Sequence, residues 1–253
     1  MEEKRLFGLI GYPLTHSFSK KYFTEKFATA GISDSHEYEL FEMTDTKNLP
    51  SLFEKYPNLE GINVTIPHKQ SVFPFLKKMD QSAEKVGAVN VIKKMPNGDL
   101  IGYNSDYYGF KRSLLEFLGN RGTQNLKALL LGFGGAGKAV LAVLNHLNIE
   151  TQLVSRKKSE TAIDYDESNR LIGSHHLIVN CTPLGTFPKT DACPDIDYKQ
   201  VGSSHFLFDL VYNPSETLFL RKGLEKGAAI KNGYDMLVYQ AEKSWEIWNN
   251  NEI

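Results

Sequence analysis

The 253-residue chain has few cysteines, almost no net charge and no long hydrophobic run. Its two cysteines, Cys181 and Cys193, show neither a metal-ligand spacing nor a disulfide framework, which indicates a reducing, cytoplasmic setting and no metal site. The 29 basic and 30 acidic residues give a net charge of −1, so we expect no nucleic acid and no membrane surface as a partner. No apolar run approaches the roughly 18 residues that span a bilayer. The N-terminus meets a glycine and a proline too early for a signal peptide.

The sequence contains an alternation of short apolar strands and helical segments, which predicts the α/β class. A polar, glycine-bearing stretch at 119–125 is typical of a linker. Strands are expected at 6–10, 37–41, 62–66, 86–92, 100–103, 127–131, 150–154, 176–180, 206–210 and 228–230, with helices at 20–29, 45–56, 70–78, 106–118, 138–147, 216–226 and a last one ending near 248.

The segment around Lys69 contains the first candidate catalytic residue. Apolar and polar residues alternate through Asn63 and Thr65, and Pro67 should end this strand because it lacks a backbone N–H. Lys69 would then lie at a strand end beside neutral hydrogen-bonding groups, as proton transfer to a small polyol requires. The alternative is a solvated lysine that begins the next helix.

Three further segments place polar side chains where a ligand could use them. Ser17 and Ser19 share one face if their loop is extended, and two hydroxyls there would suit a carboxylate or a polyol; alternatively, one of them caps the next helix. Asn90 is the one polar side chain in an apolar run that resembles a strand, so its amide needs partners or a ligand. Gln240 is the polar residue of the last helix that could reach a ligand, or it is solvated.

Asp106 stands where a helix should begin. A capping role is the simpler interpretation for an aspartate at this position. The functional interpretation pairs it with Lys69, because a nearby carboxylate would hold the charge of the lysine and aim its ammonium group.

A glycine-rich turn follows the apolar strand at 127–131 and precedes a helix. This turn, Gly132-Phe133-Gly134-Gly135-Ala136-Gly137, matches G-x-G-x-x-G in the strand–turn–helix context that dinucleotide sites require. Gly132 would allow the tight turn, Gly134 the close approach of a pyrophosphate, and Gly137 the packing of the helix on the strand.

The next strand ends in Ser155-Arg156-Lys157-Lys158, where an NAD site usually has an acidic residue for the ribose hydroxyls. A hydroxyl and three cations would instead stabilise a 2′-phosphate, so the sequence favours NADP over NAD. The alternative is a solvated basic turn.

Taken together, these motifs resemble the shikimate dehydrogenase family, and the resemblance covers nearly the whole chain. The motifs that carry it are GYPLTHSFS at 11–19, GINVTIPHK at 61–69, GAVN at 87–90, YNSDYYGF at 103–110, GFGGAG at 132–137, NCTPLG at 180–185, DLVYNP at 209–214 and GYDMLVYQA at 233–241.

The resemblance implies a role for each matching residue. Lys69 and Asp106 would form the catalytic pair, and Ser17 and Ser19 would hydrogen-bond the substrate carboxylate. The groups implied around the substrate hydroxyls are Thr65, Asn90, Asp106, Tyr212 and Gln240. The groups implied around the cofactor are Gly132, Gly134, Gly135, Ala136, Gly137, Ser155, Arg156, Lys157, Leu210 and Gly233.

The fold implied by the resemblance is an N-terminal α/β substrate domain plus a C-terminal Rossmann-like NADP domain, with the active-site cleft between them. The expected boundaries are 1–104 for the substrate domain and 105–232 for the NADP domain, with a terminal helix at 233–253 that packs back on the first domain. The implied activity is the NADP-dependent, reversible reduction of 3-dehydroshikimate to shikimate by a monomer or homodimer. The alternatives are a quinate/shikimate dehydrogenase with relaxed cofactor use, another Rossmann reductase with a different small carbonyl substrate, and a non-catalytic NADP-binding sensor.

Overall fold

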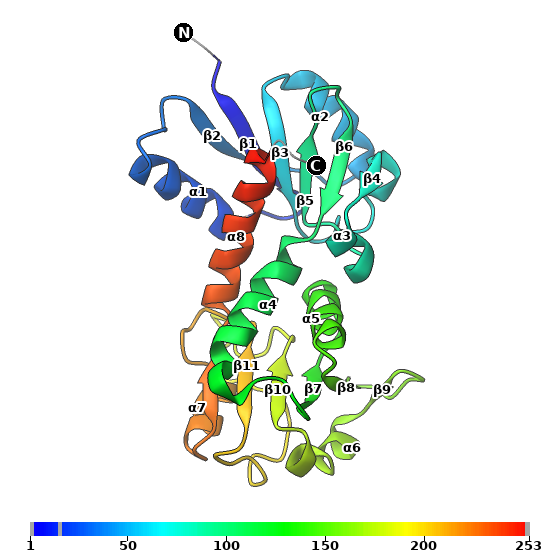
Figure 1. Ribbon diagram of the computed structural model, residues 1–253, viewed down its shortest axis with the longest axis vertical. Helices are drawn as coiled ribbons and strands as arrows, with labels where there is room; N and C mark the ends of the chain where they lie inside the picture. Colours follow the sequence, from blue (N-terminus) through cyan, green and yellow to red (C-terminus); the bar gives the residue numbers. More distant parts are fainter. Residues whose placement is uncertain (1–2, 15–16, 251–253) are drawn as a thin grey trace. The chain divides into compact units, whose positions relative to one another are not determined.

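Two β-sheets of six strands each organise the chain (Figure 1). The structure, a computed structural model, describes residues 3–14 and 17–250. The described residues up to Ser105 form one compact unit together with those from Gln240 onward, and Asp106–Tyr239 form the other. The chain passes from one unit to the other inside helix α4 (Ser105–Leu118) and again inside helix α8 (Tyr234–Asn249).

The sheet of the first unit is mixed. Its strand order is β2-β1-β3-β5-β6-β4, in which β1 pairs in parallel with β2 and β3, whereas β5 is antiparallel to both β3 and β6. The elements of this unit are β1 (Arg5–Gly11), α1 (Phe18–Thr29), β2 (His36–Glu42), α2 (Leu49–Lys55), β3 (Leu59–Val64), β4 (Lys78–Met79), α3 (Gln81–Val86), β5 (Val91–Lys94) and β6 (Leu100–Tyr103).

The alternation of side chains along β1 supplies both faces of this sheet with core residues. Phe7 and Leu9 belong to a buried cluster that also holds Phe23 of α1 and Trp248 of α8. Leu6 and Ile10, which share the opposite face, belong to a second cluster with residues of β3 and the segments that follow it. Each face of the sheet is therefore covered by its own set of apolar side chains.

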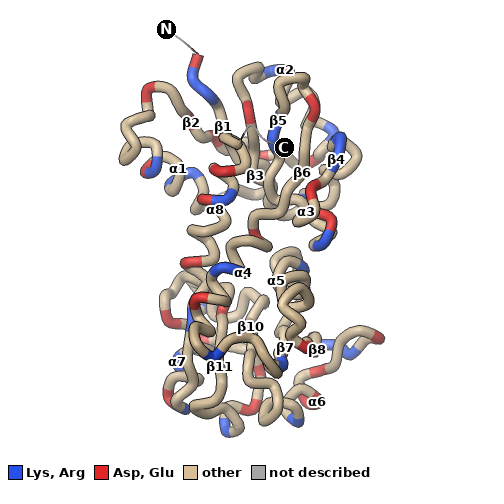
Figure 2. The backbone as a smooth tube through the Cα atoms, viewed as in Figure 1, with Lys and Arg blue, Asp and Glu red and all other residues tan. Residues whose placement is uncertain are grey.

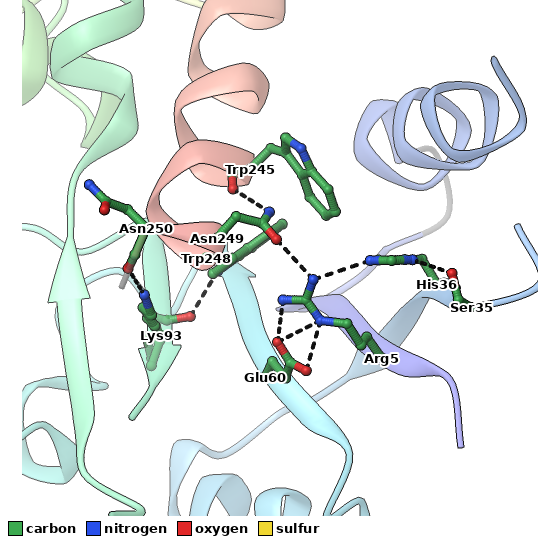
Figure 3. A network of polar contacts seen from close by, with 10 residues as sticks. Arg5, Ser35, His36, Glu60, Lys93, Trp245, Trp248, Asn249 and Asn250 are labelled. Carbon is green, nitrogen blue, oxygen red and sulfur yellow. Dashed lines mark hydrogen bonds and ion pairs between the residues drawn. The ribbon is translucent and has the colours of Figure 1, made fainter. Parts of the chain in front are cut away.

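The end of α8 is fastened to the first sheet by polar contacts (Figure 3). The Trp248 indole N–H donates to the Ile92 carbonyl oxygen at 3.1 Å, and Arg5 donates to the Asn249 side-chain oxygen at 2.9 Å. Glu60 holds the same guanidinium group through its carboxylate, with Nε at 2.9 Å. These contacts determine which residues of α8 face the sheet.

The segment between β3 and β5 differs from our expectation. The helix predicted at 70–78 is wrong: this stretch contains turns, a 3₁₀ turn at Phe73–Phe75 and the short strand β4, because Pro74 cannot continue an α-helix. The strand predicted at 86–92 is also wrong in its first half. Asp80 caps α3 through the Ala83 N–H, and Gly87 ends it with a φ of +64°, so the strand begins only at Val91.

The sheet of the second unit is entirely parallel, as the apolar strands predicted. Its order, β12-β11-β10-β7-β8-β9, is the doubly wound order of a Rossmann fold, with the chain reversing direction across the sheet between β7 and β10. The remaining elements of this unit are β7 (Lys127–Leu131), α5 (Gly135–His146), β8 (Glu150–Val154), β9 (Ala162–Ile163), α6 (Tyr165–Asn169), β10 (Leu177–Asn180), β11 (Phe206–Asp209), α7 (Leu218–Leu224) and β12 (Ala229–Lys231).

The two units confirm the predicted α/β class, and the second confirms the Rossmann-like architecture. The stretch expected as a linker, 119–125, lies inside the second unit and contains a 3₁₀ turn at Gly119–Arg121. Basic and acidic residues are interspersed along both units (Figure 2). None of the helices in the described part of the chain is long and apolar enough to cross a membrane.

Candidate active site

The glycine loop after β7 has the geometry of a phosphate-binding turn. Gly132 has a φ of +86°, a conformation that other residues rarely adopt. A Cβ atom on Gly134 would meet no heavy atom within 4 Å, so the loop is open at that point. Helix α5 starts at Gly135 without a side-chain cap, which leaves its first N–H groups for an anion.

This loop lies at the switch point of the parallel sheet. β7 pairs with β8 on one side and with β10 on the other. A Cβ on Gly132 would come within 2.7 Å of the Thr182 methyl group, so the turns after β7 and β10 are in direct contact. Gly137 packs against the Gly132 carbonyl oxygen, as close packing of helix on strand requires. Dinucleotides bind at this position in doubly wound sheets.

In the basic turn after β8, Ser155 and Lys158 already have partners within the protein. The Ser155 hydroxyl donates to the Lys157 carbonyl oxygen at 2.8 Å and accepts from the Lys157 N–H at 3.2 Å. Lys158 forms an ion pair with Glu167. Arg156 and Lys157 are exposed, so these two cations are the groups of the turn best placed to meet a phosphate.

The loop after β11 brings two of the predicted cofactor residues together. The Gly233 N–H donates to the Val211 carbonyl oxygen at 3.1 Å, and a Cβ on Gly233 would lie 2.1 Å from the Leu210 carbonyl oxygen. Only glycine allows the backbone at 233 to approach Leu210 this closely. Tyr212 follows in the same loop and is 39% exposed.

A buried carboxylate at the end of β11 organises these loops. Asp209 accepts from the Asn180 amide at 2.9 Å, from the Val211 N–H at 3.0 Å and from the Thr217 hydroxyl at 2.6 Å. Asn180 in turn accepts from the Thr182 hydroxyl at 2.6 Å. Burial raises the pKa of Asp209 to about 6, although its three hydrogen bonds act in the opposite direction.

In the first unit, Lys69 belongs to a turn that is hydrogen-bonded at both ends. β3 ends at Val64, two residues before the predicted end, because Thr65 and the residues after it form this turn. The Thr65 N–H donates to Ile10 at 2.9 Å, and the Lys69 carbonyl oxygen accepts from the Val89 N–H at 2.7 Å. Thr65 and Lys69 are both half-buried, so they can face a ligand while their backbone stays fixed.

The two serines do not lie on an extended loop, and this part of the prediction is wrong. α1 begins at Phe18, with Ser17 as its N-cap and Ser19 in its first turn. The Ser17 hydroxyl accepts from the Lys20 N–H at 3.4 Å, which confirms the capping alternative. The hydrogen of the Ser17 hydroxyl can still be donated to a ligand.

Asn90 and Gln240 meet at the start of α4. Asn90 precedes β5 and is not inside a strand, and its side-chain oxygen accepts from the Ser105 N–H at 2.7 Å. The Ser105 hydroxyl lies 3.1 Å from the Asn90 amide nitrogen and 3.3 Å from the Gln240 side-chain oxygen. Both amides are buried. The structure therefore brings two of the predicted substrate residues onto one hydroxyl group.

Asp106 lies in the first turn of α4 and is the first residue of the second unit. A carboxylate there is favoured by the positive end of the helix dipole. Lys69 belongs to the first unit, so its pairing with Asp106 stays a prediction.

The chain is similar to known proteins over nearly its whole length. The family model described as shikimate dehydrogenase substrate binding domain matches residues 9–92. A shikimate dehydrogenase (NADP(+)) of Methanococcus maripaludis strain C6 is 38% identical over 260 residues, which cover 96% of this chain and 91% of that protein. The chain belongs to the shikimate dehydrogenase family.

Solved structures of shikimate dehydrogenases also match over nearly the full length. The chorismate mutase/shikimate 5-dehydrogenase fusion protein of Clostridium acetobutylicum is 36% identical, with a TM-score of 0.87 over 99% of this chain and 94% of that chain. A shikimate 5-dehydrogenase from Listeria monocytogenes, solved in complex with shikimate and NAD, is 28% identical, with a TM-score of 0.86 over 99% of this chain and 93% of that chain.

Sequence reasoning missed the residues that support this site in the shikimate dehydrogenase fold. Ser105, Ser244 and Asp209 are fully buried and hydrogen-bonded to predicted site residues or to the loops that carry them. Ser105 and Asp209 lie inside the motifs at 103–110 and 209–214, so their place in these motifs was the available signal, although no role was predicted for either. In the part of the chain that the structure describes, no group of three His, Cys, Asp or Glu side chains could hold a metal ion.

Proposed function

We propose that this protein catalyses the NADP-dependent, reversible reduction of 3-dehydroshikimate to shikimate. The observation that carries the proposal is its relationship, over 96% of the chain, to a protein named shikimate dehydrogenase (NADP(+)). The residues of both halves of the expected site are present, and the local geometry of each half supports the role assigned to it.

The second unit would hold the cofactor. The uncapped start of α5 and the open backbone at Gly134 fit a pyrophosphate, and the cations Arg156 and Lys157 fit a 2′-phosphate. Leu210 and Gly233 lie together at the carboxyl edge of the same sheet, where the nicotinamide would be held. When bound, NADP supplies the hydride acceptor of shikimate oxidation.

The first unit would hold most of the substrate groups. Ser17 retains a hydroxyl hydrogen for a carboxylate, and Ser19 lies two residues further along the same helix start. Thr65, Asn90 and Gln240 would bind the substrate hydroxyls, together with Asp106 and Tyr212 of the second unit.

Lys69 would carry the proton transfer. In the reducing direction its ammonium group gives a proton to the oxygen that develops negative charge at C3. In oxidation the neutral amine accepts that proton. Asp106 would orient the lysine and the reacting oxygen. General acid–base assistance of this kind accelerates reactions by about 10²–10⁴-fold.

The test is the absorbance of NADPH while purified protein oxidises shikimate, with NADP and NAD in parallel and quinate as a second substrate. We expect turnover with NADP and shikimate and at least a tenfold lower kcat/KM for the other pairs. Comparable rates with NAD or quinate would transfer the proposal to the dehydrogenase with relaxed specificity, an alternative that the NAD-bound Listeria relative keeps open. Binding of NADP without turnover of any substrate would favour the remaining alternative, a non-catalytic NADP-binding sensor.

Lys69→Ala is the single substitution that tests the proposed proton transfer most directly. We expect kcat to fall by about 10²–10⁴-fold, with the KM for shikimate changed much less, because the lysine acts on the transferred proton. His68→Ala is not a suitable control, since the buried imidazole holds the turn through Met43 and Ser71. Lys85→Ala, an exposed lysine on α3, removes the same charge outside the site and should leave kcat at the wild-type value. Wild-type kcat in Lys69→Ala would refute the assignment.

The setting is also part of the proposal. Cys181 and Cys193 are both free thiols, which supports a reducing, cytoplasmic environment. We propose that the enzyme works there as a monomer or homodimer on a small-molecule substrate.

A further inference from the structure

A chain of buried polar side chains runs through the first unit behind two of the proposed substrate residues. The Tyr38 hydroxyl donates to the Asn63 side-chain oxygen at 2.8 Å, and the Asn63 amide donates to the Ser244 hydroxyl at 3.0 Å. The Ser244 and Ser105 hydroxyls lie 3.1 Å apart. All four residues are at most 6% exposed. These contacts join strands β2 and β3 to the last helix and to the start of α4.

The hydrogen positions in this chain follow from the partners. Ser244 donates its hydrogen to the Gln240 carbonyl oxygen at 2.8 Å, so its hydroxyl oxygen can only accept from Asn63 and Ser105. The Ser105 oxygen accepts from the Asn90 amide at 3.1 Å. The acceptors within reach of the Ser105 hydrogen are the Ser244 hydroxyl at 3.1 Å and the side-chain oxygens of Gln240 and Asn90, both at 3.3 Å. The Ser105 hydroxyl contacts the side chains of both Asn90 and Gln240.

We propose that Ser105 is a positioning residue whose hydroxyl holds the amides of Asn90 and Gln240 in the orientation that binds substrate. The inference rests on the proposed function, which assigns these two amides to the substrate hydroxyls. A side-chain amide has two chemically different ends, and only its hydrogen-bond partners decide which end faces a ligand. Ser105 contacts both ends of the Asn90 amide: its backbone N–H donates to the oxygen at 2.7 Å, and its hydroxyl oxygen accepts from the nitrogen at 3.1 Å. The same hydroxyl lies 3.3 Å from the side-chain oxygen of Gln240. The hydroxyl therefore supports the nitrogen end of Asn90 and the oxygen end of Gln240.

The arrangement also reduces the conformational entropy that the two amide side chains lose when substrate binds. Asn90 comes from the loop before β5 and Gln240 from α8, which are 150 residues apart in the sequence. A shared buried hydroxyl holds the two amides in fixed positions before a ligand binds. Such fixed positions are the general basis of preorganised binding sites. Without the hydroxyl, the Asn90 oxygen keeps the Ser105 backbone N–H, but the Asn90 nitrogen loses the acceptor at 3.1 Å and the Gln240 oxygen loses the donor at 3.3 Å.

The experiment compares Ser105→Ala, Ser105→Cys and Ser105→Thr in the full-length protein, with Ser113→Ala as a matched control. Ser113 is also a fully buried serine of α4, but its hydroxyl has no hydrogen-bond partner among the residues that the structure describes. KM for shikimate, KM for NADP, kcat and the melting temperature are measured for each variant. The two KM values separate an effect on substrate amides from general damage, which would change both.

We expect Ser105→Ala to raise the KM for shikimate about 10-fold and to leave the KM for NADP within about twofold of the wild type. Ser105→Thr keeps the hydroxyl and should restore the KM for shikimate to within about threefold, whereas Ser113→Ala should match the wild type. If Ser105→Ala does not fold, Ser105→Cys keeps the side-chain volume with a weaker hydrogen-bonding group and decides by the same two constants.

Three results would overturn the inference: a KM for shikimate within twofold of the wild type in Ser105→Ala or Ser105→Cys, an equal rise of both KM values, or a Thr variant that behaves like Ala. The failure of the proposed function is visible separately. A wild-type protein that does not turn over shikimate overturns that function before any variant is compared, and the role of Ser105 falls with it.

Discussion

At the scale of single residues, the basic turn after β8 shows how neighbours of one charge acquire different roles. Lys158 is paired with Glu167, and Ser155 is engaged with the backbone of its own turn. Arg156 and Lys157 are exposed. A guanidinium group binds phosphate through two parallel hydrogen bonds, so Arg156 is the residue on which preference for a 2′-phosphate should depend most.

Arg156→Ala should therefore separate the two nicotinamide cofactors. We expect the KM for NADP to rise about 10-fold and the KM for NAD to stay within about twofold, because NAD lacks the 2′-phosphate. Steady-state kinetics with both cofactors at saturating shikimate measures this. Lys127→Ala is the control, since this lysine pairs with Glu150 at the opposite, amino-terminal end of the same sheet. An equal rise of both KM values would place Arg156 outside the phosphate site.

Residue-level prediction was confirmed in its local structure where one short motif contains the whole signal: the glycine turn lies between β7 and α5, as predicted, and its contact with a cofactor stays a prediction. The glycine loop could be assigned from its spacing, because the turn, the phosphate approach and the helix packing all depend on adjacent residues. The support of Asn90 and Gln240 could not be predicted in the same way. It depends on Ser105 and Ser244, whose partners lie up to 181 positions away in the sequence.

At the scale of elements, α8 depends on a close contact with β3. A Cβ atom on Gly61 would lie 2.2 Å from the Trp248 ring, so the indole packs directly on the strand backbone. The ring cannot move away freely, because its N–H is bonded to the Ile92 carbonyl oxygen and the next residue, Asn249, is held by Arg5 (Figure 3). A strand glycine is thus part of how the last helix is seated on its own sheet.

Gly61→Ala should destabilise the first unit by about 1–3 kcal/mol, the usual range for overpacking a tightly packed site. Alanine would otherwise stabilise a strand by roughly 0.5–1 kcal/mol, so the sign of the change isolates the contact with Trp248. Urea denaturation followed by circular dichroism and by tryptophan fluorescence measures the loss. Gly202→Ala, where a Cβ would meet nothing within 4 Å, should stay near the wild type in circular dichroism. A Gly61→Ala variant at least as stable as the wild type would contradict the packing argument.

Element prediction failed mainly between β3 and β5, and for identifiable reasons. The apolar residues around Pro74 resemble a helix face, but the proline and the short turns override that pattern. α3 is only six residues long, so its apolar periodicity is too short to distinguish it from a strand. Its Asp80 cap and Gly87 terminus were the usable signals.

At the scale of the whole molecule, the two units differ in how directly their sequence specifies them. The second unit repeats one strand–helix pattern into a parallel sheet, whose strands read as continuous apolar runs. The first unit mixes parallel and antiparallel pairs and takes its last helix from the far end of the chain. Its topology depends on pairings that no local pattern encodes.

The two units can also be followed separately, because Trp245 and Trp248, the two tryptophans of the chain, belong to the first unit. Tryptophan fluorescence therefore reports on the first unit alone, whereas circular dichroism reports on both. This difference makes it possible to assign a pH effect to the second unit, where Asp209 joins the loops after β10 and β11.

Asp209 should make the second unit less stable as the pH rises from about 4 to 6. Burial raises its pKa from 3.8 to about 6, so between these values the folded state binds more protons than the unfolded state, and the free energy of unfolding falls with increasing pH. Integrated over the window, this single group accounts for roughly 3 kcal/mol, present below pH 4 and lost above pH 6. Carboxylates whose pKa is lowered, such as Glu116 and Glu150, act in the opposite direction, so the wild-type profile alone cannot isolate Asp209.

The difference between wild type and Asp209→Asn does isolate it, because every other titrating group is common to both proteins. Asparagine keeps an acceptor for the Asn180 amide and the Val211 N–H, and the Thr217 hydroxyl can turn to accept from its new amide group. We expect the stability of the variant relative to the wild type to increase by roughly 3 kcal/mol from pH 4 to pH 7, in urea denaturation followed by circular dichroism. A difference that stays constant over this range would show that Asp209 is ionised in the folded protein already at pH 4, and that the three donors around it outweigh its burial.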